Sequence, residues 1–332
     1  MRLSPRITPA LLDLDQGRSS RFSISCPLMT PPQSQSRAIA LESSDAGVNV
    51  GSSARAFIEL TKPRLSFFSI LTAMATYGAA SNQLGLQHAL TTLIGVSLCA
   101  GGALSLNQWW ERDLDSLMSR TRNRPLPKRR IPPGQALAFS LALSITGLCI
   151  LALFISELAA FYAAATILIY GLVYTPLKKR TRWATEIGAI SGALPPLIGS
   201  AAADVPSSPI GISLFLIILV WQMPHFHAIG WRFREDYQAA GFPLLAAIDD
   251  SGKRVAAWTF GYSILLLVLP VALYALDWVG LALLLVSLVA GADLCWSSFR
   301  FRKTLSDQHA HRLFISTIRY LPVVLIGCLI PN

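Results

Sequence analysis

The chain has 332 residues, of which 53% are hydrophobic and only 14% are charged, and its formal net charge is +10. A soluble domain of this length needs more charged surface, so the composition excludes an ordinary soluble protein. The apolar residues also come in long runs, which predicts an all-α, polytopic membrane protein. In a soluble protein the positive charge would suggest nucleic-acid binding. Here the basic residues flank the apolar runs, so we expect a lipid bilayer around the chain and no nucleic-acid partner.

Residues 1–55 are rich in Ser, Arg, Pro and Gln and contain no apolar run long enough for a secretory signal. We expect a disordered N-terminal tail, followed by an intramembrane domain over residues 56–332. The arginines resemble those of a mitochondrial transit peptide, but Asp13, Asp15, Glu42 and Asp45 argue against one. We therefore favour the bacterial inner membrane, with the mitochondrial inner membrane as the alternative.

Windows of about 20 residues predict nine transmembrane helices. Every Lys and Arg after residue 60 lies before the first span, in the loops after the second, fourth, sixth and eighth spans, or in the first half of the ninth. This one-sided placement predicts that the N-terminus and those loops face the cytoplasm. The predicted spans are residues 65–81, 89–109, 135–155, 158–175, 187–203, 209–229, 256–274, 278–297 and 313–330.

The second span runs into a charged segment, NQWWERDLDSLMSRTRNRPLPKRR, from Asn107 to Arg130. Asn107, Glu111 and Asp115 recur at every fourth residue, which on a helix sweeps only about 80° around the axis. Their oxygen atoms can therefore reach one point. Oxygen ligands beside basic residues suit a Mg²⁺ ion that carries a polyphosphate. The alternative is a juxtamembrane charge cluster that only fixes topology.

Basic residues also flank the first and fourth spans. Lys62 and Arg64, in ELTKPRLSFF, could anchor the chain to lipid headgroups or contact an anionic substrate, and we favour the anchor. After the fourth span, YTPLKKRTRW could serve orientation or phosphate binding. Its basic residues are Lys178, Lys179, Arg180 and Arg182.

Two later spans carry signs of an internal site. In the fifth span, IGAISGALPPLIG, Pro195 and Pro196 predict a broken helix, which favours a binding chamber over a simple kink. In the sixth, His225 and His227 follow Pro224, and an ionisable residue at membrane depth is a candidate functional group. Farther along, Asp293 and Arg319 are isolated intramembrane charges whose partners cannot be read from spacing.

These segments resemble the UbiA superfamily of intramembrane prenyltransferases over residues 57–330. The Asn107, Glu111 and Asp115 pattern is similar to the first motif of the superfamily, Asn-xxx-Asp-xxx-Asp, with Glu111 in place of the first Asp. MSRTRNRPLP, YTPLKKRT and WQMPHFHAIGWRFREDY resemble the branch that farnesylates heme. In the second motif, Asp-xxx-Asp, Arg232 replaces the first acid and only Asp236 remains, which puts a symmetric two-metal site in doubt.

The resemblance implies a nine-helix bundle that transfers a farnesyl group from farnesyl diphosphate to a vinyl group of heme B. The product, heme O, would serve terminal oxidases, so contact with heme A synthase or with oxidase assembly factors would fit. A Mg²⁺ cofactor and the catalytic site are expected on Asn107, Glu111, Asp115 and Asp236. His225 would contact the heme, and Arg232 or Arg234 a propionate. The residues expected to bind the diphosphate are Arg120 and Arg124, which we favour, and Lys128, Lys178 and Lys179.

Three other functions remain open at this stage. A UbiA-type enzyme could instead act on a quinone precursor or on a chlorophyll-like tetrapyrrole. A secondary transporter would fit the broken fifth span but leaves the carboxylate face unexplained. A non-catalytic heme-binding assembly factor would need no Mg²⁺.

Overall fold

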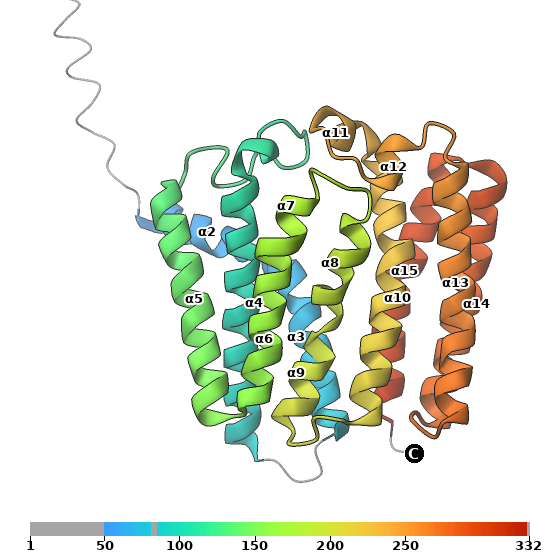
Figure 1. Ribbon diagram of the computed structural model, residues 1–332, viewed down its shortest axis with the longest axis horizontal. Helices are drawn as coiled ribbons and strands as arrows, with labels where there is room; N and C mark the ends of the chain where they lie inside the picture. Colours follow the sequence, from blue (N-terminus) through green and yellow to red (C-terminus); the bar gives the residue numbers. More distant parts are fainter. Residues whose placement is uncertain (1–49, 81–84, 331–332) are drawn as a thin grey trace, which may run out of the picture. The chain divides into compact units, whose positions relative to one another are not determined.

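The computed structural model describes residues 50–80 and 85–330, which belong to one compact unit. The predicted disorder of residues 1–49 lies outside this range. A helix, α2 (Val50–Leu60), already covers the last residues of the predicted tail. All regular secondary structure in the described residues is helical (Figure 1).

Each of the nine predicted spans coincides with a helix or a broken helix in the described ranges. Seven of them are long and apolar enough to cross a membrane, and α3 and the broken fifth span are not among these seven. The chain is a multi-pass membrane protein. The elements are α3 (Pro63–Ala80), α4 (Leu86–Asp115), α5 (Pro133–Phe154), α6 (Glu157–Leu168), η1 (Ile169–Tyr174), α7 (Thr175–Leu177), α8 (Ala184–Ala193), α9 (Pro195–Ala202), α10 (Pro209–Arg232), α11 (Arg234–Ala239), α12 (Leu245–Ile248), α13 (Lys253–Ala275), α14 (Leu281–Thr304) and α15 (Asp307–Cys328).

The fifth span breaks where the Pro-Pro pair predicts. Helix α8 ends at Ala193 and α9 begins at Pro195. Close to the break, Gln222 of α10 donates to the carbonyl oxygen of Ala189, at 2.9 Å. A Cβ at Gly192 would lie only 2.1 Å from Gln222 Oε1, so a larger residue would force the Gln222 side chain to move.

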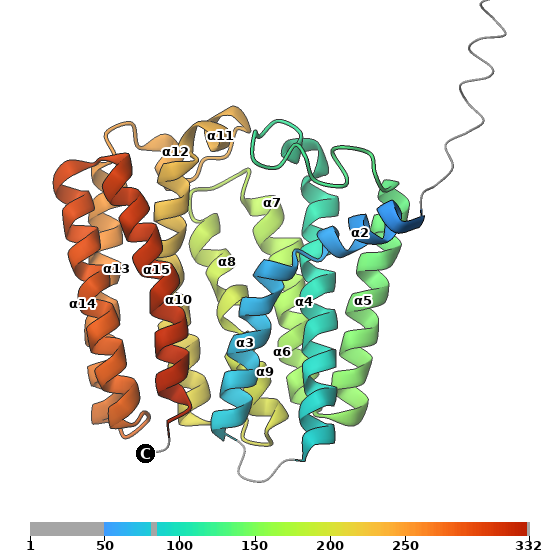
Figure 2. The same cartoon turned by 180° about the vertical axis from the view of Figure 1, so that it is seen from behind.

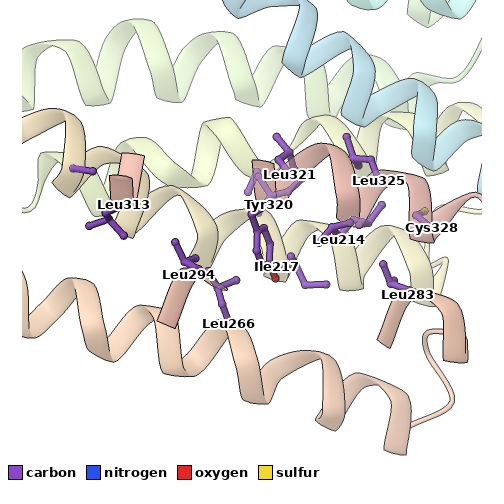
Figure 3. Close-up of a cluster of buried hydrophobic side chains, with 14 of the residues drawn as sticks. Leu214, Ile217, Leu266, Leu283, Leu294, Leu313, Tyr320, Leu321, Leu325 and Cys328 are labelled. Carbon is purple, nitrogen blue, oxygen red and sulfur yellow. The ribbon is translucent and has the colours of Figure 1, made fainter. Parts of the chain in front are cut away.

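The largest core cluster joins α10 to α13, α14 and α15, and Leu214, Leu266, Leu294 and Tyr320 lie at its centre (Figure 3). These side chains are almost completely buried. This tight packing fixes the position of α10 relative to α15.

Helix α2 lies beside the polar end of α4 (Figure 2). Gln108 of α4 donates to the carbonyl oxygens of Glu59, at 3.1 Å, and of Leu60, at 2.9 Å. The chain then turns into α3 at Lys62, whose φ of 47° is in the left-handed region. This turn brings the Lys62 side chain to α4.

Candidate active site

The polar face of α4 points into the bundle. Asn107, Glu111 and Asp115 are 2%, 4% and 0% exposed. Buried acids need charge partners, because an unpaired carboxylate away from water is costly.

Each of these side chains is paired with a cation from a different segment. Lys62 Nζ donates to Asn107 Oδ1 at 2.8 Å, and Lys178 Nζ donates to Glu111 Oε1 at 3.1 Å. Arg124 Nη1 lies 2.6 Å from Asp115 Oδ2. Three cations far apart in the sequence therefore meet on one helix face.

The end of the fourth span brings the side chains of Thr175 and Lys178 to the polar face of α4. A π-helical turn, η1, precedes α7, and such turns are frequent at functional sites. Just after it, the Thr175 hydroxyl accepts from Asn107 Nδ2 at 3.1 Å. One turn later Lys178 reaches Glu111.

The two lysines respond differently to burial. Burial opposes the charged form of Lys178, but the neighbouring Glu111 carboxylate outweighs it and raises the pKa of Lys178 above its ordinary value. Burial, and then the charge of Arg124, lower the pKa of Lys62 to about 7. Within residues 50–80 and 85–330, the Lys62 ammonium contacts Asn107 and pairs with no carboxylate, so an added anion would stabilise its charged form.

The segments that follow α4 and α10 meet in the structure. Asp236 of α11 accepts hydrogen bonds from the Ser119 hydroxyl, at 2.8 Å, and from the Ser119 amide, at 3.3 Å. Burial works against ionisation, but these bonds hold the pKa of Asp236 below its usual range. Arg120 Nη2 donates to Tyr237 Oη at 3.3 Å across the same junction.

The side-chain oxygen atoms on the buried face of α4 are the groups that suit a Mg²⁺ ion. Asp115 Oδ1 is buried and has no hydrogen-bond partner among the described residues. Together with the oxygens of Asn107 and Glu111, it suits a hard cation that shares its coordination with substrate phosphate. Over residues 50–80 and 85–330, no three His, Cys, Asp or Glu side chains form a ready metal cluster. A metal set that includes Asp236 therefore stays a prediction.

The predicted diphosphate-binding residues separate into two groups. Arg124 and Lys178 contact the carboxylates of α4. Arg120 instead packs its guanidinium over the Phe233 ring, 5.0 Å from the centroid. Lys128 and Lys179 are exposed, and their side chains make no hydrogen bond or ion pair to the described chain.

The predicted heme-binding residues lie where α10 meets α15. His225 Nδ1 is 2.9 Å from Thr317 Oγ1, and Arg232 Nη1 is 3.2 Å from His311 Nδ1. Arg234 pairs with Asp307 at 3.1 Å. His227, by contrast, is buried against Thr259 of α13.

Sequence reasoning missed several members of this site. Lys62 was expected to anchor the chain to lipid, yet it contacts Asn107. The sequence did not mark Thr175 or Ser119 as site residues, because a single hydroxyl residue next to a motif is common. The only available hint for Lys62 was its place just before the first span, opposite the end of the second.

A model of the UbiA prenyltransferase family matches residues 66–319. The chain belongs to this family. The protoheme IX farnesyltransferase of Opitutus terrae is 39% identical over 274 residues, which cover 81% of this chain and 92% of the relative. The predicted family, fold class and enzyme class are thus confirmed: this is a prenyltransferase. A secondary transporter is not supported.

Solved structures show the same fold. A digeranylgeranylglyceryl phosphate synthase superposes with a TM-score of 0.70 at 19% identity, over 83% of this chain and 97% of that one. A UbiA homologue from Archaeoglobus fulgidus, bound to GPP and Mg²⁺, gives a TM-score of 0.57 at 14% identity, over 83% of this UbiA chain and 100% of the homologue.

Proposed function

We propose that this UbiA prenyltransferase transfers a farnesyl group from farnesyl diphosphate to a vinyl group of heme B, giving heme O. The observation that carries the proposal is the buried α4 face, on which Asn107, Glu111 and Asp115 meet three cations. The name of the Opitutus terrae relative, protoheme IX farnesyltransferase, supports this choice of donor and acceptor.

The cations of the site suit a diphosphate leaving group. With Lys62 protonated, the three basic side chains carry more positive charge than Glu111 and Asp115 neutralise. The surplus favours an anion, and charge-assisted hydrogen bonds to its oxygens strengthen as negative charge develops on the leaving group. Mg²⁺, held by Asn107, Glu111 and Asp115, would add Lewis-acid stabilisation of that charge. The Archaeoglobus fulgidus homologue bound to GPP and Mg²⁺ supports this cofactor.

The reaction balances with one water molecule. The bond between C1 of the farnesyl group and the diphosphate oxygen breaks, and the diphosphate leaves with the electron pair. The terminal vinyl carbon of the heme attacks the allylic cation and forms the new carbon–carbon bond. Water then adds to the other vinyl carbon and loses a proton, which gives the hydroxyethylfarnesyl side chain. Premature water would quench the allylic cation, and this explains a site buried in the bundle.

The heme would lie along the α10 face that packs against α15. Arg232 follows His225 by seven positions, which is about 10.5 Å of helix rise and nearly a whole number of turns. Both side chains turn toward α15. His225 would face the iron at membrane depth, and Arg232 would meet a propionate near the aqueous surface.

We also propose that the N-terminus faces the cytoplasm and that the protein resides in a bacterial cell membrane. The loops after α4, α7, α10 and α14 lie at one end of the bundle, and the basic residues are concentrated there (Figure 1). Substrate diphosphate would then enter from the cytoplasm. The intramembrane domain would begin with α2 rather than at residue 56. Contact with heme A synthase or oxidase assembly factors would deliver the product.

The test is a comparison of acceptors. The purified full-length protein is incubated with farnesyl diphosphate and Mg²⁺, with heme B in one reaction and 4-hydroxybenzoate in another. We expect mass spectrometry to detect hydroxyethylfarnesyl heme from the first reaction and no prenylated product from the second. Prenylation of 4-hydroxybenzoate alone would assign the chain to quinone biosynthesis instead.

A further inference from the structure

The His225 ring is held in a stack of aromatic side chains. Its centroid lies 5.0 Å from that of Trp221, with 19° between the ring planes, and 5.5 Å from that of Phe314, with 23°. Two aromatic rings thus lie nearly parallel to the imidazole, and the His225 side chain is only partly buried.

One nitrogen of the His225 ring forms a hydrogen bond with Thr317 of α15. Thr317 Oγ1 lies 2.9 Å from His225 Nδ1 and 2.6 Å from the carbonyl oxygen of Phe314. A hydroxyl has a single proton, and a carbonyl oxygen can only accept. The hydroxyl therefore donates to Phe314 and accepts from His225, so the proton of the neutral imidazole is on Nδ1.

We infer that Thr317 is a positioning residue that keeps His225 in the Nδ1–H tautomer and presents the lone pair of Nε2 to the iron of a heme substrate. This inference rests on the proposed function. Nε2 makes no hydrogen bond to any residue in the ranges 50–80 and 85–330. A hydrogen bond at the distal nitrogen commonly fixes the tautomer and orientation of a histidine that binds a metal.

The same arrangement occurs at the neighbouring histidine and provides a control. Thr259 Oγ1 donates to the carbonyl oxygen of Val255 at 2.6 Å and lies 3.1 Å from His227 Nδ1. His227 is only 4% exposed and packs toward α13. Loss of the Thr259 hydroxyl should thus disturb a buried histidine without changing heme ligation.

The experiment titrates ferric heme B into the purified full-length protein and follows the visible and electron paramagnetic resonance spectra. Wild type should show an imidazole-ligated iron, and His225→Ala should lose this signature. Thr317→Val, which keeps the shape but removes the hydroxyl, should bind heme about 10- to 100-fold more weakly and with altered ligation. Thr317→Ser should restore the wild-type spectrum, and Thr259→Val should match wild type.

Two results would overturn the inference: a Thr317→Val protein with the affinity and spectrum of wild type, or a wild-type spectrum identical to that of His225→Ala. If Thr317→Val does not fold, Thr317→Ala takes its place against the same serine variant. Heme O formation is measured on the same preparations. Absence of product from wild type would count against the proposed function, whereas product with an unchanged Thr317→Val spectrum would count only against the role of Thr317.

Discussion

Lys178 and Glu111 form an ion pair between the end of α7 and the middle of the polar face of α4, with 3.1 Å between Nζ and Oε1. The two side chains are only 12% and 5% exposed. Lys178 also lies 4.9 Å from the centroid of the Phe242 ring, in the connection between α11 and α12. One cation thus joins three parts of the bundle around the site.

Replacing Lys178 with Met should weaken farnesyl diphosphate binding at least about tenfold, because a charge-assisted hydrogen bond contributes about 1.5 to 3 kcal/mol. The measurement is the KM for farnesyl diphosphate in the heme B assay. Lys179→Met is the matched control, since Lys179 is exposed and its side chain makes no polar contact with the described chain. If both substitutions raised KM equally, the basic residues after the fourth span would serve only to orient the protein in the membrane.

Lys62→Met should lower kcat/KM at least about tenfold, because it removes the cation that contacts Asn107 at 2.8 Å. Arg64→Met removes an exposed basic residue two positions later and should leave turnover near wild type. The outcome separates a role in the site from lipid anchoring. If Arg64→Met is the more damaging change, Lys62 has no role in the reaction.

Asp115→Asn should reduce kcat by at least about 100-fold, because it removes a buried charge that is assigned to Mg²⁺ and pairs with Arg124. The side-chain volume hardly changes, so the protein should remain folded in the membrane. Asp113→Asn is the control, since that side chain is 88% exposed. Turnover by Asp115→Asn at the wild-type rate would remove Asp115 from the catalytic site.

Glu59 provides a pH-dependent test of how α2 is held. Its hydrogen bond from Arg130 keeps the pKa of the Glu59 carboxyl below its usual 4.5. The stabilisation is therefore present above pH 4.5 and is lost as the pH falls below that value. Glu59→Gln should cost less than about 1 kcal/mol of stability at neutral pH, as exposed ion pairs do.

The measurement for Glu59 is the thermal unfolding midpoint of wild type and Glu59→Gln in the same detergent. The difference between the two proteins should shrink as the pH is lowered through the range in which the carboxylate becomes protonated. A difference that stays constant from neutral to acidic pH would mean that the charge of Glu59 does not stabilise α2.

The positions of the spans could be predicted from the sequence because hydropathy is a local property. Helix α5, for example, runs from Pro133 to Phe154 where residues 135–155 were predicted. The i, i+4, i+8 pattern likewise placed Asn107, Glu111 and Asp115 on one buried face, since helix geometry alone determines it.

Pairings between helices could not be predicted in this way. Asp293 and Arg319 looked isolated in the sequence, yet they form an ion pair at 3.0 Å between α14 and α15. Lys62 reaches Asn107 only because the chain turns between α2 and α3. Such contacts depend on how helices are placed around the core, and no spacing within one segment encodes that.

In the proposed reaction, the buried α4 face, with its cations, activates farnesyl diphosphate for transfer to heme B. The most direct measurement is heme O formation by purified protein, quantified by mass spectrometry with Mg²⁺ and with excess chelator, for wild type and Asp115→Asn. We expect hydroxyethylfarnesyl heme only from wild type with Mg²⁺. Equal product from Asp115→Asn, or from wild type stripped of divalent cations, would contradict this expectation.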